Sequence, residues 1–338
     1  MQTQKVRINK YDNLKGFAII LIVLVHVLDV ATLNIATFDS VTLFTKFVTI
    51  IHLPIFFFVA GYFSKIGPDE PIKAFKRLFV PYILFSLLFV VALTFAGLET
   101  QTLFIYTAPG MWFLITLFAM KLVLPILNKF KYPILISIVI ALLFGFINID
   151  YRILGITRFF SYLPIFLIGF KYKNHEINLK INYEKINDWF NNKFFVIIVG
   201  ILILVVWIII AVMFPRNVVG LYDPYQGSFE MIERLILLLL SISAVLYLNK
   251  IFTNKKSYLT KIGKNSFSIY VLHLYICSLM RSHLILGLLP KGELNYLIFA
   301  VIATIVIVLI LSRDFVTTIV NTVIDAICSL FIKDLNEK

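Results

Sequence analysis

Runs of about twenty apolar residues recur from end to end of this chain and constrain its fold more than any other feature. Each run is long enough to cross a hydrocarbon core of about 30 Å as a helix. The 338 residues are 60% hydrophobic and 14% charged, with a mean hydropathy of +0.95, a composition that excludes a soluble domain. We therefore predict an all-α polytopic membrane protein in which residues 1–338 form one integral membrane domain.

About ten transmembrane helices are predicted from these runs, between residues 14 and 311. The predicted spans are Leu14–Leu33, Val41–Phe63, Leu78–Gly97, Met111–Leu127, Tyr132–Ile149, Gly155–Phe170, Phe194–Phe214, Phe229–Leu248, Ser266–Leu288 and Leu294–Leu311. Residues 312–332 follow a different pattern, in which apolar side chains such as Phe315 and Ile319 recur at helical spacing opposite polar ones. This pattern predicts a C-terminal amphipathic helix in the inner membrane interface or against the bundle.

Basic residues alternate between crowded and sparse connections, which predicts the orientation. The outer connections hold only Lys46, Arg152, Arg216 and Lys291, whereas every inner connection holds several basic residues. The positive-inside rule therefore places both termini in the cytoplasm and the protein in the cell membrane, with the lipid bilayer as its partner. The net charge of +13 is spread over many short loops rather than gathered in one patch, so no nucleic acid partner is predicted.

Lys15 and His26 mark the first predicted span. On a helix this eleven-residue step places both side chains on one stripe, about 16 Å apart along the axis, with Asp12 and Asp29 near the same stripe. Ionisable groups inside a membrane are expensive and usually functional. A histidine bonded to a neighbouring helix for packing is the alternative, and the stripe alone does not decide between them.

Two further histidines lie inside predicted spans, His52 midway along the second and His273 early in the ninth. A neutral imidazole is a general base near pH 7 and can also accept an acyl group as a nucleophile. Three imidazoles can instead bind zinc, but no cysteine or carboxylate cluster at ligand spacing supports them. We predict no metal site.

Several other polar residues have both a functional and a structural interpretation. Lys76 and Arg77 stand at the start of the third span, where they can hold a phosphorylated cofactor or simply set orientation. Arg158 can line an outward vestibule or extend to the interface. The outer loop Pro215–Ser228 contains Tyr222 and Asp223 and can contact a sugar or serve as a plain connector.

The ordered motifs resemble the membrane-bound acyltransferase 3 family, most closely its branch of fucose 4-O-acetylase-like polysaccharide O-acetyltransferases. The matching stretches are Lys15 with Gly16 and His26, Phe56–Phe63 with its Ala-Gly-Tyr, Lys76 and Arg77 ahead of Pro81, Trp112–Leu114, Pro164–Gly169, and Ser266–His273. Many members have arginine at the position of Lys15, and lysine lacks the planar fork for bidentate phosphate contact.

The resemblance implies a membrane O-acetyltransferase that moves an acetyl group from cytoplasmic acetyl-CoA to a sugar hydroxyl of a lipid-linked or cell-surface polysaccharide. The implied site comprises His26, Asp12 and Asp29 as catalytic residues, Lys15, Lys76 and Arg77 around acetyl-CoA, and His52, Trp112, Arg158, Tyr270 and His273 in the substrate pocket. A transporter or exporter of a lipid-linked sugar is the main alternative, because many spans with scattered polar residues are also typical of transporters. A non-catalytic membrane sensor or scaffold is a third.

Overall fold

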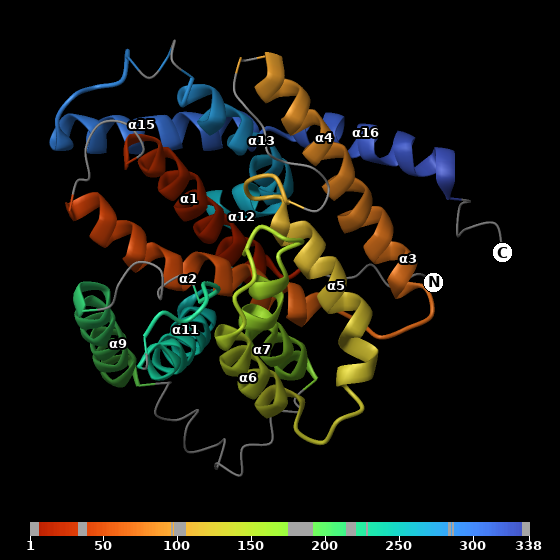
Figure 1. Cartoon of the computed structure of the whole chain (residues 1–338), viewed down its shortest axis with the longest axis vertical. Helices are drawn as coiled ribbons and strands as arrows, with labels where there is room; N and C mark the ends of the chain where they lie inside the picture. Colours follow the sequence, from red (N-terminus) through yellow and green to blue (C-terminus); the bar gives the residue numbers. More distant parts are fainter. Residues whose placement is uncertain are drawn as a thin grey trace.

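The computed structural model describes residues 7–32, 39–95, 97, 106–174, 192–213, 221–227, 229–282, 285 and 287–332. Within these residues every regular element is a helix, and one isolated bridge pairs Tyr106 with Ile153. The prediction of an all-α membrane protein is confirmed (Figure 1).

The helices follow one another along the chain with short connections. They are α1 (Asn9–Thr32), α2 (Asp39–Phe63), α3 (Glu70–Ala74), the π-helix η1 (Phe75–Phe79), α4 (Val80–Phe95), α5 (Trp112–Leu127), α6 (Pro133–Leu143), the 3₁₀ helix η2 (Phe144–Phe146), α7 (Ile156–Lys173), α9 (Lys193–Met213), α11 (Glu230–Ile251), α12 (Tyr258–Lys264), α13 (Ser266–Met280), α15 (Glu293–Leu311) and α16 (Asp314–Phe331).

Seven helices in the described part are long and apolar enough to cross a membrane. They are Asn9–Val30, Val41–Phe63, Glu70–Phe95, Lys193–Met213, Glu230–Ile251, Glu293–Leu311 and Asp314–Phe331. The apolar helices Trp112–Leu127, Pro133–Phe146 and Ser266–Met280 are shorter. The sixth predicted span coincides with α7, which carries Arg158 and is buried along nearly its whole length. Protein rather than lipid therefore surrounds α7, which is why that helix can carry polar side chains.

Helix α1 lies at the centre of the bundle and packs against α2, α12, α13 and α15 (Figure 1). Its apolar side chains divide between two buried clusters. Leu14 and Ala18 belong to a cluster shared with α2, α4, α5 and α7, whereas Val23 and Leu28 belong to one shared with α13 and α15. The bundle therefore encloses α1 on several sides, and the polar side chains of this helix face protein.

Two glycines bring α2 and α7 into backbone contact. A Cβ atom at Gly61 would overlap the carbonyl oxygen of Phe166, and one at Gly169 would overlap that of Phe58. Small residues let membrane helices approach this closely, and dispersion contacts along the crossing then hold the pair together. The two glycine-ending stretches that carried the family resemblance thus form one helix crossing, which positions α7 beside the centre of the bundle.

The short helix α12, absent from the predicted spans, crosses α1 in a similar way. A Cβ atom at Gly16 would overlap the carbonyl oxygen of Leu259, and one at Gly263 would overlap that of Asp12. Because α12 directly precedes α13, this crossing holds the beginning of α13 against α1.

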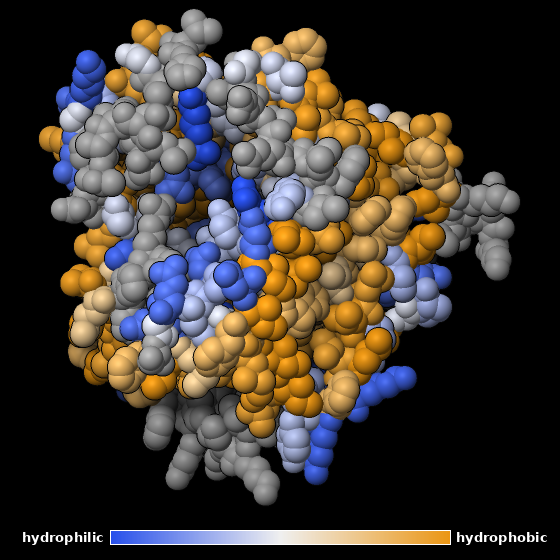
Figure 2. All heavy atoms as spheres, viewed as in Figure 1, coloured by the Kyte–Doolittle hydropathy of each residue, from blue (hydrophilic) through white to orange (hydrophobic). Residues whose placement is uncertain are grey.

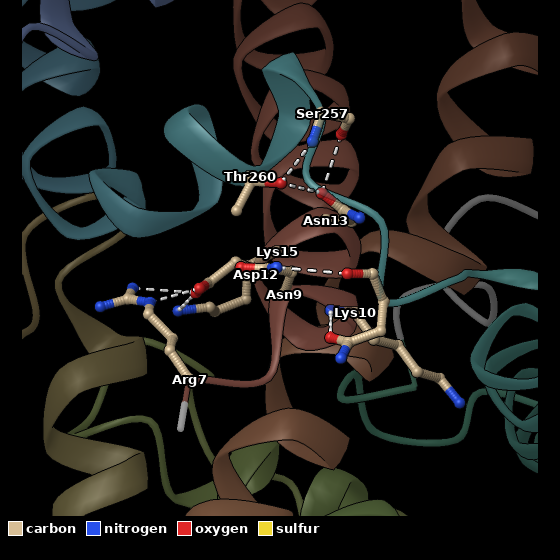
Figure 3. Close-up of polar contacts among 9 residues, drawn as sticks. Arg7, Asn9, Lys10, Asp12, Asn13, Lys15, Ser257 and Thr260 are labelled. Atoms are coloured by element: carbon tan, nitrogen blue, oxygen red, sulfur yellow. Dashed lines mark hydrogen bonds and ion pairs between the residues drawn. The ribbon is translucent and has the colours of Figure 1, made fainter. Parts of the chain in front are cut away.

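Asn13 connects α1 to the chain that leads into α12 (Figure 3). Its Nδ2 donates to the carbonyl oxygens of Thr253 at 3.2 Å and Lys255 at 2.9 Å. Its Oδ1 accepts from the hydroxyls of Ser257 at 2.9 Å and Thr260 at 2.6 Å. All four hydrogen-bonding positions are used, so Asn13 determines how the α12 segment meets α1.

Helix α16 occupies the range of the predicted amphipathic helix. Val320, Ile324 and Cys328 recur every fourth residue and are buried, while Phe315 and Ile319 are exposed. The buried stripe packs on α4, η1 and α13. The exposed apolar residues are suited to lipid contact.

Candidate active site

A cavity of about 440 Å³ opens between α1, α2, α13 and the first residues of α5 and α7. Its lining residues are Ile22, Val25, His26, Asp29, Thr45, Lys46, Thr49, His52, Leu53, Gly110, Trp112, Tyr151, Arg158, Tyr222, Asp223 and Tyr270. On the face shown in Figure 2, hydrophilic atoms gather in and around a hollow, while most other coloured atoms are hydrophobic. A pocket with a few convergent polar groups is the default candidate for a binding or active site.

His26 and Asp29 bring two ionisable groups of α1 into this cavity. They are three residues apart, so they lie on one face of the helix. His52 of α2 lines the same cavity, and its Nδ1 lies 2.8 Å from the carbonyl oxygen of Val48. Because a carbonyl oxygen can only accept, Nδ1 of His52 carries the proton and Nε2 bears the lone pair. The cavity thus offers an imidazole lone pair and a carboxyl group within one small space.

His273 lies behind His26 rather than among the cavity-lining residues. The centres of the two rings are 5.3 Å apart, and His273 is fully buried. Its Nδ1 lies 2.9 Å from the carbonyl oxygen of Ile269, whereas its Nε2 has no hydrogen-bond partner among the described residues. The fold therefore places a second imidazole against the first.

Arg158 is enclosed by three aromatic rings at the wall of the cavity. Its guanidinium carbon lies 4.4 Å from the ring centre of Trp112, 4.7 Å from that of Tyr151 and 4.2 Å from that of Tyr222. Its Nη1 donates to the carbonyl oxygen of Tyr151 at 3.1 Å. Cation–π contacts of this kind hold a guanidinium in one orientation, so Arg158 is a fixed positive charge at the cavity.

The described end of the outer loop, residues 221–227, carries Tyr222 and Asp223 into the cavity; residues 214–220 and 228 lie outside the described part. The Ser161 hydroxyl donates to the carbonyl oxygen of Leu221, and the Arg234 guanidinium donates to that of Asp223. Burial raises the pKa of the Asp223 carboxyl above its usual value, although Arg158 and Arg234 oppose the shift. The loop therefore contributes to the site as well as connecting α9 to α11.

Tyr225 anchors the same loop on the far side from the cavity. Its backbone N–H donates to the carbonyl oxygen of Gly145 at 2.7 Å, and its hydroxyl donates to that of Leu142 at 2.9 Å. A side chain at Gly145 would overlap the Tyr225 ring. Contacts to α6, α7 and α11 thus determine where Tyr222 and Asp223 lie.

Tyr270 reaches the cavity from α13. Its hydroxyl donates to the carbonyl oxygen of Gly110, a glycine with φ +79° just before α5. This bond connects α13 to the segment that carries Trp112, and both residues line the cavity.

Lys15 and Asp12 lie away from this cavity, near the beginning of α1 (Figure 3). Lys15 Nζ is 3.0 Å from Asp12 Oδ1, and Arg7 Nε is 2.5 Å from Asp12 Oδ2. The fourteen residues between Asp12 and His26 correspond to about 21 Å along the helix. Asp12 therefore contacts the cations of the helix start, and Asp29 is the carboxyl group of α1 that shares the cavity with His26.

Lys76 and Arg77 belong to the π-helix η1, where Lys76 is half-buried and Arg77 is exposed. A π-helical turn inside an α-helix frequently marks a functional position. In the part of the chain that the structure describes, none of Lys15, Lys76 and Arg77 lines the cavity of His26. The structure thus places the cations predicted to bind acetyl-CoA apart from the cavity-lining residues.

Several cavity residues were not among the predicted site residues. They include Thr45, Lys46, Thr49, Gly110 and Tyr151. Lys46 carried a signal, since it is one of the few basic residues in the outer connections. The described residues contain no group of three or more His, Cys, Asp or Glu side chains that could hold a metal ion.

Comparison with known proteins gives one match. The model of an acyltransferase domain family, acyltransferase 3, matches residues 8–313. No curated protein and no solved structure matches the chain. The matched range runs from the start of α1 to the end of α15 and includes every residue of the cavity.

Proposed function

The chain belongs to the acyltransferase 3 family of membrane acyltransferases, and we propose that it is an O-acetyltransferase acting on a carbohydrate. In this proposal it belongs to the fucose 4-O-acetylase-like branch and lies in the cell membrane with both termini in the cytoplasm. The acetyl donor is cytoplasmic acetyl-CoA. The acceptor is a hydroxyl of a lipid-linked or cell-surface polysaccharide.

The position of His26 in the cavity is the observation that carries this proposal. His26 lies on the central helix and faces a space of about 440 Å³ together with Asp29, His52 and Tyr270. An imidazole with a carboxyl group one turn away is suited to remove a proton from a hydroxyl. A cavity with aromatic rings and polar groups is suited to a sugar.

The two ends of α1 suggest where the two substrates approach. Lys15 lies in the second turn of the helix, and Lys76 and Arg77 lie at the start of the third membrane helix, so under the proposed orientation all three serve the cytoplasmic phosphates of acetyl-CoA. The cavity is lined by residues toward the other end of α1 and by the outer loop. The acceptor therefore enters from the outer side in this proposal.

The proposed reaction transfers the acetyl group without net loss of a proton. His26 takes the proton from the acceptor hydroxyl, and the hydroxyl oxygen bonds to the thioester carbonyl carbon. The carbon–sulfur bond then breaks, and the sulfur of CoA takes the proton from His26. In the alternative sequence His26 itself accepts the acetyl group first. Acid quenching with radiolabelled acetyl-CoA distinguishes the two, because only the second leaves label on the protein.

Replacement of His26 by alanine tests the proposal. We expect His26→Ala to abolish transfer of label from acetyl-CoA to the glycan of membranes from cells that lack the gene. Val27→Ala serves as the matched control, since Val27 is the next residue of α1, is fully buried and does not line the cavity. Both variants should elute as folded monodisperse protein in detergent. Unchanged glycan acetylation by His26→Ala would refute the proposal, and sugar flux without acetyl transfer would favour the transporter alternative.

A further inference from the structure

We propose that His273 is a positioning residue for His26 and accepts a hydrogen bond from the ring of His26 whenever that ring holds the transferred proton. This inference rests on the proposed function, because it assigns His26 as the base. It gives His273 a role different from the substrate contact implied by the family resemblance.

The first observation is the protonation of His273. Its Nδ1 lies 2.9 Å from the carbonyl oxygen of Ile269, one turn earlier in α13. A carbonyl oxygen has no proton to give, so Nδ1 must carry the hydrogen. The Nε2 atom of neutral His273 therefore bears a lone pair and is an acceptor.

The second observation is that this acceptor has no partner. His273 is 0% exposed, and its Nε2 makes no hydrogen bond to any described residue. A buried polar atom without a partner costs free energy, and such atoms in folded proteins call for an explanation. A partner that appears only during the reaction supplies one.

The third observation is the distance between the two rings. Their centres are 5.3 Å apart. A hydrogen bond of about 3 Å between two ring nitrogens, each about 1.2 Å from its ring centre, requires a separation of about 5.4 Å. A rotation of the His26 ring is therefore sufficient to form the bond, without movement of either helix.

The fold also explains why His273 is held in this place. The crossing of α12 with α1 at Gly16 and Gly263 sets the beginning of α13 against α1. The bond from Tyr270, one turn before His273, connects the same helix to Gly110. Both contacts fix α13 in rotation, and His273 does not line the cavity, so it reaches the reaction through His26.

In the reaction, His26 takes the hydroxyl proton on the nitrogen that faces the cavity and becomes an imidazolium. Its other N–H then donates to Nε2 of His273, which disperses the positive charge in an apolar surrounding and holds the ring in the productive orientation. When the sulfur of CoA takes the proton back, His26 returns to its neutral form. His273 gains and loses no proton in this cycle.

The test compares variants of the purified full-length protein with radiolabelled acetyl-CoA and membranes from cells that lack the gene as the source of acceptor. His273→Phe fills a similar volume without an acceptor, and His273→Gln restores one. Loss of one hydrogen bond to a charged group predicts a kcat about 10- to 100-fold lower for His273→Phe, with the KM for acetyl-CoA within about twofold of the wild-type value. We expect His273→Gln to recover part of the lost kcat.

Cys277→Ala is the control for packing, because Cys277 lies one turn further along α13, is buried and does not line the cavity. It should leave kcat unchanged. If His273→Phe does not fold, His273→Leu, which is smaller, provides the same comparison. A kcat within twofold of wild type for the folded apolar variant, or a His273→Gln activity no higher than that variant, would overturn the inference while leaving the proposed function intact. Absence of transfer by the wild-type protein would instead overturn the proposed function.

Discussion

Asn13→Ala should destabilise the protein by removing the four hydrogen bonds that join α1 to the segment before α12 (Figure 3). Thr253, Lys255 and Ser257 are exposed and can bond to water instead, so each of these bonds contributes little. Thr260 is 0% exposed and its hydroxyl loses its acceptor. Leaving a buried hydroxyl without a partner costs about 1–3 kcal/mol, which together with the three weaker bonds gives about 2–4 kcal/mol.

The measurement is equilibrium unfolding by SDS titration from mild detergent, followed by the fluorescence of the three tryptophans. Asn9→Ala is the matched control, because Asn9 lies one turn earlier and its side chain makes one exposed bond of 3.2 Å to the carbonyl oxygen of Asn254. The control should change the free energy of unfolding by less than about 0.5 kcal/mol. A difference of less than about 1 kcal/mol between the two variants would refute the view that Asn13 holds the α12 segment.

Two further predictions concern helix packing and pH. Gly169→Ala should lower the free energy of unfolding by about 1–3 kcal/mol, because the new methyl group overlaps the Phe58 carbonyl, whereas Gly200→Ala should be nearly neutral because it meets the end of the flexible Tyr247 side chain; equal effects in SDS titration would contradict this. Burial raises the pKa of Asp223, so its carboxyl is tolerated best below its unfolded pKa and the favourable contribution is lost as pH rises through the folded value. Asp223→Asn should therefore raise the melting temperature at pH 7 and do so less at pH 4, and a gain that grows toward pH 4 would show that the sign is wrong.

Local properties of the sequence predicted the helices well. A run of apolar residues and its length are visible without knowledge of any partner, and each of the ten predicted spans coincides with helix in the described structure. The start of α1 was placed too late, at Leu14 instead of Asn9, because residues 9–13 are polar. Asn13 remains helical there through its bonds to the α12 segment, which are contacts about 240 residues apart in sequence.

The candidate site was predicted in part for the same reason. The residues Lys15, His26 and Asp29 share one helix, so helical periodicity alone placed them on one stripe. Periodicity could not show that Asp12 pairs with Arg7 and Lys15 at the helix start. That arrangement depends on which side chains reach one another in space.

The amino-acid sequence by itself determined that this chain is a bundle of membrane helices with imidazole and carboxyl groups on its first helix, because hydropathy and helical spacing are local quantities. Only the tertiary structure decided that Tyr222 and Asp223 enter the cavity of His26 and that His273 stands behind His26. These positions follow from how the glycine crossings rotate each helix and from how Ser161 and Arg234 hold the outer loop. Contacts between distant segments leave no periodic pattern in the sequence, and so they appear only once the helices are packed.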